Sequence, residues 1–360
     1  MRIAGRRKRP TAGEGSRYLR AMFQAEHGDW RRFVAPALVV LLACATVFVQ
    51  YRGLLADSGG RDPRQFIEVD LRERHDAVLD HSVGDPWRYR LLSEWGAEGA
   101  LQVAKGLGIS EPAVVGFLGF RLLQNLVIFA LMWVFLRRIG IGWYESLLGL
   151  GLLGWGFTQA LYHQAMSFNT YGDLAFYLAA AVLVLNRRWW WIVPLTVAAA
   201  VNRETSGLIP VMLMAMALPL GWRSEEGRRA LKIGAIALVA FGLTYGILRA
   251  AVGSSFFIEA DGQSPGAELF EYNVVRGMTW DFVFQTLNIL PLLALLSLRR
   301  WPPELKAIGL AIVPAWIAIH VFTSVLAESR LLLVPLGLVF IPGALAGLGW
   351  RPDDGPDPSP

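Results

Sequence analysis

Cysteine is nearly absent from this sequence, since only one of its 360 residues, Cys44, is a cysteine. A single cysteine excludes a framework of intramolecular disulfides, and its place in an apolar run indicates packing rather than thiol chemistry. Histidine is also scarce, with five in the chain, and the spacing of these five fits no zinc motif. The scarce residues therefore give no support to a disulfide-stabilised or zinc-dependent protein.

Charged residues are also few. Charged residues make up 18% of the chain, whereas 54% of the residues are hydrophobic and the mean hydropathy is +0.41. Several apolar runs approach or exceed the roughly 18 residues that indicate a transmembrane helix. The sequence therefore predicts an all-α integral membrane protein. Its net charge of +5 does not indicate a nucleic-acid partner, because the Lys and Arg residues lie beside the apolar runs.

Ten apolar segments are predicted to cross the membrane, so both ends of the chain lie on one side. In residue numbers the segments are 33–51, 113–136, 140–161, 171–186, 189–201, 205–221, 230–250, 279–298, 307–326 and 331–349. The connections on the side of the N-terminus are short and basic, as at Arg137–Arg138, Arg187–Arg188 and Arg299–Arg300. The positive-inside rule places this side in the cytoplasm. We expect a multi-pass protein of the bacterial inner membrane.

The chain is accordingly divided into three parts. Residues 1–32 are predicted as a basic cytoplasmic arm, residues 33–350 as the transmembrane domain and residues 351–360 as a disordered cytoplasmic tail. No small-residue cleavage site cleanly follows the first apolar run, so this run is interpreted as an uncleaved helix rather than a signal peptide. The two long outer loops, residues 52–112 and 252–278, are where chemistry outside the membrane is expected.

The stretch VNRETSG, residues 201–207, interrupts the apolar run between Trp189 and Trp222. One helix over residues 189–221 would be about 50 Å long at about 1.5 Å per residue, well beyond the roughly 30 Å hydrocarbon core. It would also move the later basic connections to the outer side. We therefore predict two short helices joined by a polar turn at Asn202–Thr205 that opens to the outer side. A plain loop with an Arg–Glu pair is the alternative.

The first outer loop is predicted to hold helices that lie in the membrane interface. Asp62 before Pro63 suits a helix N-cap and first turn, and another turn is expected at Gly84–Asp85–Pro86. Arg88 and Arg90 follow this second turn. Such a pair either contacts lipid headgroups or forms an anion clamp, because guanidinium groups bind phosphate through two parallel hydrogen bonds.

Other polar residues gather at the predicted outer ends of the spans, where one outward-facing cavity would explain them together. The residues predicted to line this cavity are Arg121, Asn125, His163, Asn169, Asp173, Asn202 and Glu328. Taken singly, each has a plainer explanation as a structural pair or a helix cap. Most acidic residues of the first loop are expected on a solvated face, and one well-placed carboxylate there could act as a general base.

This layout resembles the GT-C superfamily of polytopic membrane glycosyltransferases over nearly the whole chain. Three segments carry a local similarity to bacterial GT-C-like proteins, namely GDPWRYRLLSEW (84–95), NRETSG (202–207) and ESRLLLVPLG (328–337). The resemblance implies a GT-C-like fold of about ten helices. It also implies transfer of a sugar from a polyprenyl-phosphate donor to an extracytoplasmic glycan, lipid or protein acceptor.

The resemblance further implies roles for individual residues. Superfamily members commonly use an Asp or Glu of the first outer loop as base, often in an acidic pair or an Asp-Gly-aromatic segment, and this sequence has neither. The roles implied here are Asp70, Asp85 and Glu204 as catalytic carboxylates, and Arg88, Arg90, Arg203 and Arg330 as ligands of the donor phosphate. Some members use a divalent metal, for which Asp173 or Glu204 could supply oxygen ligands. No pattern in the sequence requires a cofactor.

Two other functions stay open at this level. A transporter or flippase of a lipid-linked or anionic substrate would also use short broken helices with a polar apex, and it would need a polar path to the cytoplasmic face. An inactive GT-C-like scaffold of an envelope complex would fit the missing acidic pair. Membrane lipids are expected partners in each case.

Overall fold

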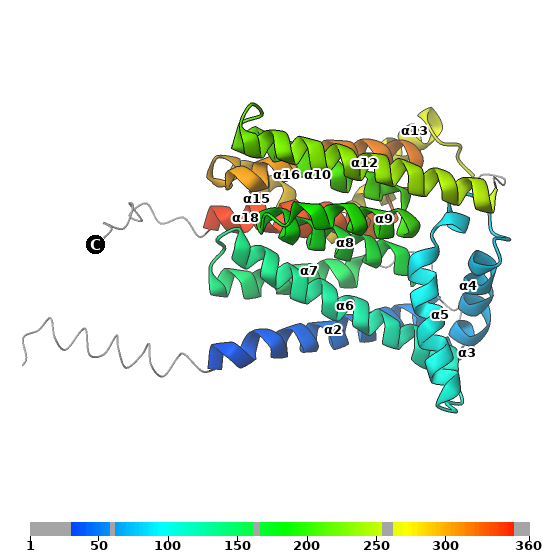
Figure 1. The fold of residues 1–360 in the computed structure, drawn as a ribbon. Coiled ribbons are helices and arrows are strands. Elements are labelled where there is room, and N and C mark those ends of the chain that lie inside the picture. The colour runs from blue at the N-terminus through cyan, green and yellow to red at the C-terminus, as the bar shows by residue number, and fades with distance from the viewer. Residues whose placement is uncertain (1–29, 58–61, 161–165, 254–261, 349–360) are drawn as a thin grey trace, which may run out of the picture.

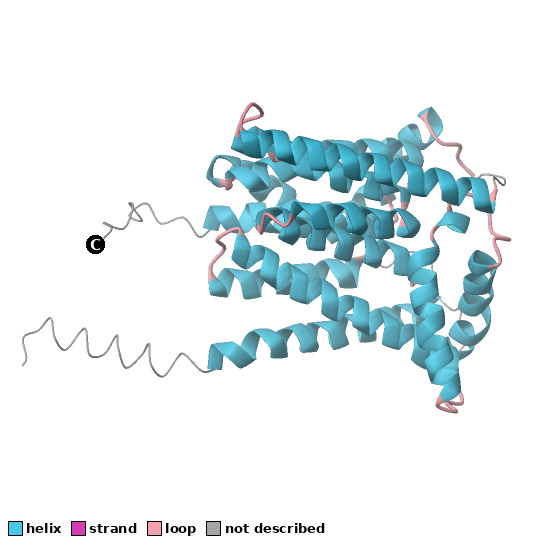
Figure 2. Ribbon diagram, in the orientation of Figure 1, coloured by secondary structure: helices cyan, strands magenta, loops and turns pink. Residues whose placement is uncertain are grey.

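The computed structural model describes residues 30–57, 62–160, 166–253 and 262–348, and within these ranges helices joined by turns and loops make up the chain, with no strand (Figure 2). The longer helices are α2 (Trp30–Asp57), α4 (Arg72–Leu79), α5 (Leu91–Gly106), α6 (Pro112–Arg138), α7 (Trp143–Gln159), α8 (Phe168–Leu185), α9 (Ile192–Asn202), α10 (Leu208–Ala215), α12 (Glu225–Val252), α13 (Ala267–Val275), α14 (Gly277–Leu287), α15 (Leu290–Leu296), α16 (Pro303–Thr323) and α18 (Ile341–Leu348). Short helical segments join them, namely α3 (Pro63–Phe66), η1 (Ile67–Leu71), η2 (Trp87–Tyr89), η3 (Trp189–Trp191), η4 (Glu204–Gly207), α11 (Ala217–Leu220), η5 (Leu298–Arg300), η6 (Ser329–Leu332), α17 (Leu333–Pro335) and η7 (Leu336–Phe340).

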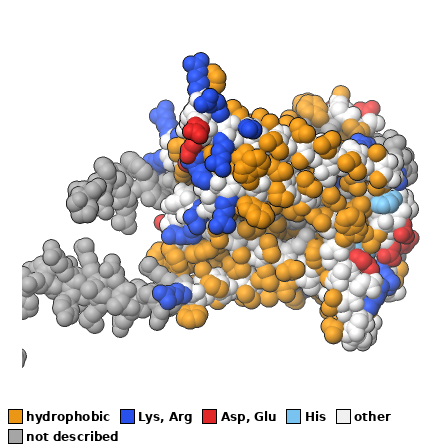
Figure 3. Space-filling view, viewed as in Figure 1, with side chains coloured by type: hydrophobic (Ala, Val, Ile, Leu, Met, Phe, Trp, Pro, Cys, Tyr) orange, Lys and Arg blue, Asp and Glu red, His pale blue; other side chains and the backbone are white. Residues whose placement is uncertain are grey.

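Most helices lie roughly along one axis and form a bundle, while α3, α4 and α5 lie at one end of it (Figure 1). The face of the bundle seen in Figure 3 carries a broad hydrophobic zone in the middle, and Lys and Arg gather at the end opposite α3–α5. We call the end with α3–α5 the polar end and the other the basic end. A hydrophobic zone between two charged ends is the surface expected of a protein that spans a bilayer.

Six helices are long and apolar enough to cross a membrane, and α14 with α15 makes a seventh candidate that is bent by 64°. The six are Arg32–Leu54, Pro112–Arg138, Phe168–Leu185, Glu225–Val252, Pro303–Thr323 and Ser329–Leu348. The prediction of an all-helical protein with membrane-length helices is thereby confirmed. The number of ten crossings stays a prediction, because α7, α9 and α10 are shorter than a full span.

The break predicted at VNRETSG is confirmed, because α9 ends at Asn202 and η4 begins at Glu204. Arg203 between them is extended, with φ −164° and ψ 147°. The two halves run in opposite directions along α12. The ring of Trp189, before α9, lies 5.9 Å from the guanidinium of Arg229, near the start of α12. Gly207, before α10, contacts Phe241, much further along α12. Residues 189–221 therefore form a hairpin.

A pocket at the basic end shows that the chain returns there repeatedly. It is lined by Arg138 after α6, Arg187 after α8, Met216 after α10 and Glu304 at the start of α16. Connections far apart in sequence thus meet at one end of the bundle, as the predicted alternation of spans requires. The predicted arm and tail, apart from residues 30–32 at the start of α2, lie outside the described residues.

The first outer loop starts later than predicted, because α2 continues to Asp57 rather than ending near residue 51. Asp62 caps α3 as expected, since its Oδ1 accepts a hydrogen bond of 3.0 Å from the backbone N–H of Arg64. The loop is anchored to the bundle by α5, which packs on α6. The approach is close at Gly116, where a Cβ would lie 2.7 Å from the Cα of Leu101. The helices at the polar end are therefore fixed to the bundle.

The second outer loop, predicted at residues 252–278, contains α13 and the start of α14. Residues 254–261 of it lie outside the described part. Asn273 of α13 is fully buried and holds this loop to the end of α16, because its Nδ2 donates to Val321 O at 2.9 Å and to Ser324 O at 2.8 Å. Its Oδ1 accepts from the N–H of Leu326 at 2.8 Å.

Candidate functional site

The polar turn between α9 and α10 lies beneath the helices of the polar end. Arg90, at the start of α5, donates from Nε to Glu204 Oε2 at 3.2 Å and from Nη2 to Glu204 Oε1. Arg90 is 7% exposed, and its guanidinium lies 4.6 Å from the ring centroid of Trp87. Two parallel hydrogen bonds between a guanidinium and a carboxylate fix both position and orientation. The pair therefore fixes the polar end to the hairpin.

Asn202 makes the second link between these parts. The Oγ of Ser93 in α5 donates to Asn202 Oδ1, and Asn202 Nδ2 donates to the carbonyl of Asn169 at 2.8 Å. Asn202 is fully buried, so both bonds are protected from water. Gly172 makes room for them, since a Cβ there would lie 2.6 Å from Ser93 Oγ. Three segments, α5, α8 and α9, meet at this one amide.

Arg203 points into the protein and is 3% exposed. Its Nη1 donates to Thr170 Oγ1 at 3.3 Å, and its Nη2 lies 3.4 Å from His320 Nε2. Its Nε has no hydrogen-bond acceptor among the described residues. Asp173, fully buried nearby, accepts a hydrogen bond of 2.8 Å from Thr205. The Arg203 guanidinium thus has polar neighbours but forms no direct ion pair within the described residues.

Arg330 and Arg121 complete the group of guanidinium ions. Arg330, in η6, is 4% exposed and donates to Glu328 Oε2 at 2.7 Å. Arg121, in α6, is fully buried, and its guanidinium lies 3.6 Å from the ring centroid of Tyr171. None of its three side-chain nitrogens has a hydrogen-bond acceptor in the described parts of the chain. A buried guanidinium that lacks acceptors is costly, so an anion from outside the chain would stabilise it.

These side chains are linked electrostatically through Arg330, which lies within range of both Arg203 and Arg121. The charges of Arg90, Arg330, Asp173 and Glu204 all act on Arg203, and those of Arg330 and Glu94 act on Arg121. We call Arg90, Arg121, Arg203 and Arg330 the arginine cluster. It joins four segments that are far apart in the sequence.

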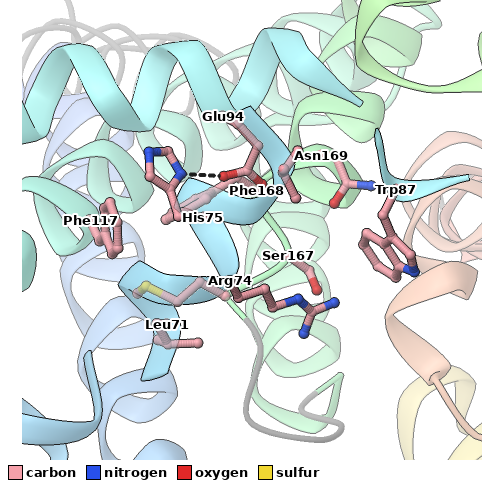
Figure 4. A pocket seen from close by; sticks show the side chains of 11 residues that line it. Leu71, Arg74, His75, Trp87, Glu94, Phe117, Ser167, Phe168 and Asn169 are labelled. Atoms are coloured by element: carbon pink, nitrogen blue, oxygen red, sulfur yellow. Dashed lines mark hydrogen bonds and ion pairs between the residues drawn. The ribbon is translucent and has the colours of Figure 1, made fainter. Parts of the chain in front are cut away.

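A pocket is lined by residues of α4, η2, α5, α6 and α8 (Figure 4). It adjoins the arginine cluster through two of its rings, because Trp87 lies beside Arg90 and Phe168 beside Arg121. Its lining residues are Leu71, Arg74, His75, Val78, Trp87, Glu94, Phe117, Met166, Ser167, Phe168 and Asn169. Its cavity volume is about 40 Å³. The guanidinium of Arg74 extends toward Ser167 and Trp87, and it lies 4.8 Å from the Trp87 ring centroid (Figure 4). Ser167 Oγ and Asn169 Nδ2 are buried without a hydrogen-bond partner in the described residues, so the pocket has unused polar groups.

His75 lies between two carboxylates beside this pocket. Its Nδ1 is 2.7 Å from Glu94 Oε2 and its Nε2 is 3.0 Å from Glu98 Oε2. Burial opposes a charge on the imidazole, but the hydrogen bonds and negative charges of Glu94 and Glu98 outweigh it. The pKa of His75 is therefore raised above its ordinary value. The two glutamates therefore favour the charged form of His75 beside the pocket.

A cation could be held at one place within the described residues, where ligand atoms of His75, Asp76 and Glu98 lie within 4.8 Å of one another. The residues named from the sequence as metal ligands are engaged elsewhere. Asp173 accepts from Thr205, and Glu204 is paired with Arg90. The geometry therefore offers no support for a metal at Asp173 or Glu204.

The structure brings together many, but not all, of the predicted site residues. Asn169, Asp173, Asn202, Glu204 and Glu328 lie with the arginine cluster.

Asp85 and Arg88 instead hold the polar end to the end of α12. Asp85 Oδ2 accepts from Arg249 at 3.2 Å, and Arg88 Nη2 donates to Val252 O at 3.2 Å. Asn125 bonds to Thr46 of α2 at 2.9 Å. Asp70, in η1, is partly exposed and does not line the pocket, and His163 lies outside the described residues.

Sequence reasoning missed Arg74, His75, Glu94 and Glu98. Glu94 and Glu98 are one helical turn apart, so their shared face was visible in the sequence. Their meeting with His75 was not, because α4 folds back on α5 through the intervening turn. His320 was missed because it looks like a lone polar residue in an apolar helix.

Comparison with known proteins gives no match: no family model, no curated protein and no solved structure resembles the chain significantly. The fold and the site define the class only as an all-helical protein with membrane-length helices.

Proposed function

We propose that the protein is a membrane glycosyltransferase of GT-C-like fold that transfers a sugar from a polyprenyl-phosphate donor to an extracytoplasmic acceptor. The observation that carries this proposal is the arginine cluster, in which four buried guanidinium groups lie near the junction of the apolar bundle and its polar end and are linked electrostatically through Arg330. A phosphate on a long apolar chain needs both surroundings, namely cations for its head and an apolar surface for its tail.

The cluster suits the charge that develops during transfer. When the bond between the anomeric carbon and the phosphate oxygen breaks, that oxygen gains negative charge. Guanidinium groups already in place stabilise this charge without further reorganisation. Arg121, with three unused N–H groups, and Arg203, with an unused Nε, have the donors to do so. Arg90 is held by Glu204 and Arg330 by Glu328, which keeps both guanidinium groups in place.

The acceptor hydroxyl must lose its proton as its oxygen bonds to the anomeric carbon. Glu94 is the best-placed carboxylate for this step, because it lines the pocket beside the cluster and its Oε2 is held 2.7 Å from His75 Nδ1. The proton passes to Glu94 and the leaving phosphate keeps the electron pair of the broken bond. The carboxylates expected from the sequence, Asp70, Asp85 and Glu204, have weaker claims. Asp70 does not line the pocket, Asp85 is paired with Arg249, and Glu204 is paired with Arg90.

The orientation follows from the charge pattern. Basic connections at Arg137–Arg138, Arg187–Arg188 and Arg299–Arg300 favour the cytoplasmic side, and Lys and Arg gather at that end of the bundle (Figure 3). We therefore place the basic end in the cytoplasm of a bacterium and the arginine cluster on the extracytoplasmic side of the inner membrane, in a topology of ten crossings.

A transporter or flippase is the second candidate, supported by the broken hairpin alone. It would need a polar path from the arginine cluster to the basic end. Between these ends, α8 from Leu174 to Leu185 and α16 from Ala307 to Ile319 carry no charged side chain. Both helices contribute many of these residues to the main hydrophobic core. This packing favours a site with access from one side only.

The proposal is tested with full-length protein in nanodiscs, by measuring binding of a radiolabelled polyprenyl-phosphate sugar and its transfer to an acceptor extract. Arg90→Ala and Arg203→Ala are expected to abolish both while the protein still inserts in membranes. Arg72→Ala is the matched control, since Arg72 lies on the surface of α4 in a loose pair with Asp76. Normal activity in both cluster variants would overturn the assignment of the site.

A further inference from the structure

The pocket at the basic end has chemistry that the proposed function does not use. Its volume is about 260 Å³, and it opens between the ends of α6, α8 and α10 and the start of α16. Ile139, Val184 and Met216 form a buried apolar floor, while Arg138 and Arg187 are exposed at its edge. Glu304 supplies one carboxylate. Two cations, one anion and an apolar floor thus share a single small cavity.

The two arginines stand where the apolar helices end. Arg138 is the last residue of α6, and Arg187 follows the last residue of α8 by two positions. In a spanning protein, this is the level of the lipid phosphates, to which long basic side chains extend. Arg138 has no hydrogen bond or ion pair with another side chain in the described ranges. Arg187 is paired with Glu226 at 3.0 Å, but both side chains are largely exposed, so the pair is weak.

We propose that this pocket binds a phospholipid through a phosphoethanolamine headgroup. Arg138 and Arg187 bind the phosphate, Glu304 accepts hydrogen bonds from the ammonium group, and the apolar floor contacts the adjoining glycerol and methylene carbons. Glu304, the only carboxylate among the described residues that line the pocket, favours a headgroup with a positive charge. An ammonium group donates charge-assisted hydrogen bonds to it, the hydroxyl groups of phosphatidylglycerol donate only weaker uncharged ones, and choline offers no N–H donor. The volume fits a headgroup rather than a whole lipid, since pockets for larger ligands hold roughly 300–1,000 Å³.

This inference does not rest on the proposed glycosyl transfer, because it uses other residues at the other end of the bundle. It assigns the pocket a specific lipid, which would hold α6, α8 and α16 together at the membrane surface.

The test is native mass spectrometry of the full-length protein released from nanodiscs that contain phosphatidylethanolamine, phosphatidylglycerol and phosphatidylcholine in equal amounts. We expect one retained phosphatidylethanolamine in excess over the other two. The variant Arg138→Gln/Arg187→Gln should weaken retention of this lipid at least about tenfold, because charge-assisted bonds are lost. The matched control is Arg228→Gln/Arg299→Gln, which removes the same charge from exposed positions outside the pocket.

A separate variant tests the headgroup. Glu304→Gln should reduce the preference for phosphatidylethanolamine over phosphatidylcholine and leave the phosphate contacts in place. A merely structural role of Glu304 would lower thermal stability equally in all three lipids and leave the preference unchanged. That result, equal retention of the three lipids by the unmodified protein, or equal losses in the pocket variant and its control would each overturn the proposal.

Discussion

Arg90 and Glu204 are 114 positions apart in the sequence and form a two-pronged ion pair. Arg90 is the residue before α5, and Glu204 is the first residue after the break in the hairpin. Arg203, next to Glu204, turns its own side chain inward to Thr170 and His320. Glu204 therefore binds the polar end through Arg90, whereas the side chain of its neighbour Arg203 faces the interior of the protein, where the arginine cluster lies.

The ion pair between Arg90 and Glu204 is expected to stabilise the fold. Arg90→Ala and Glu204→Ala should each lower thermal stability in detergent, and the double variant should cost less than the sum, with a coupling of about 0.5–3 kcal/mol. The exposed pair Arg187 and Glu226 is the control, because surface pairs contribute at most about 1 kcal/mol. Equal coupling in the two cycles would show that the buried pair does not fix the polar end.

Removing the side-chain amide of Asn202 should destabilise the protein by more than the loss of a single hydrogen bond. Asn202→Ala leaves Ser93 Oγ and the carbonyl of Asn169 without their partner inside the protein, which costs about 1–3 kcal/mol for each buried group. Thermal unfolding followed by tryptophan fluorescence measures the loss. Thr323→Ala is the control, since the exposed Thr323 hydroxyl bonds only within its own helix, and it should leave the melting temperature nearly unchanged.

The variant Arg121→Met is expected to lose ligand binding without losing stability. Replacing a buried charge without acceptors by an apolar side chain of similar length is often neutral or stabilising, so Arg121→Met should melt at the same temperature or higher. If the unused donors of Arg121 bind the donor phosphate, the same variant loses binding of a polyprenyl-phosphate sugar. A variant that melts normally and also binds normally would remove Arg121 from the site.

His75 gives the polar end a defined dependence on pH. The pKa of its imidazole is raised by Glu94 and Glu98 against the opposing effect of burial, while the exposed Asp76 lies beside it. A raised pKa contributes stability that is fully present below the ordinary histidine pKa of about 6.5, and this stability is lost as the pH rises through the raised value.

The difference in melting temperature between the unmodified protein and His75→Gln should therefore be largest in mild acid and shrink toward alkaline pH. Replacing His81 by Gln is the control, because the imidazole of His81 makes a long contact of 3.4 Å to Arg88 O and no other polar contact to a described residue. A difference that grows with pH would show that His75 is neutral in the folded protein.

The sequence predicts the helical class and the break at Asn202–Thr205 because apolar length and the position of charges are local properties. It also places Asn202, Arg203 and Arg330 in one polar set, since each interrupts an apolar run. Asp85 and Arg88 show where this reasoning ends. A carboxylate and a guanidinium group are residue types common in binding sites, but here they bond to Arg249 and Val252 at the end of α12. These contacts depend on where α12 packs in the folded protein, and the sequence does not show this.

Glu94 is the opposite case, a residue that the sequence did not place in the site although it lines the pocket. It looks like a solvated residue of an amphipathic helix, yet α4 covers it and brings His75 to within 2.7 Å. Contacts between segments that fold back through irregular turns depend on packing, and no local periodicity encodes them.

The central claim is that the arginine cluster acts on a lipid-linked sugar phosphate. The most direct measurement is mass spectrometry of lipid extracts from a strain that lacks the gene, complemented with the unmodified protein or with the Arg203→Ala variant at equal membrane abundance. We predict that a polyprenyl-phosphate sugar accumulates in the deletion strain and with Arg203→Ala, and returns to the parental level with the unmodified protein. Identical lipid-linked pools in all three strains would contradict the account.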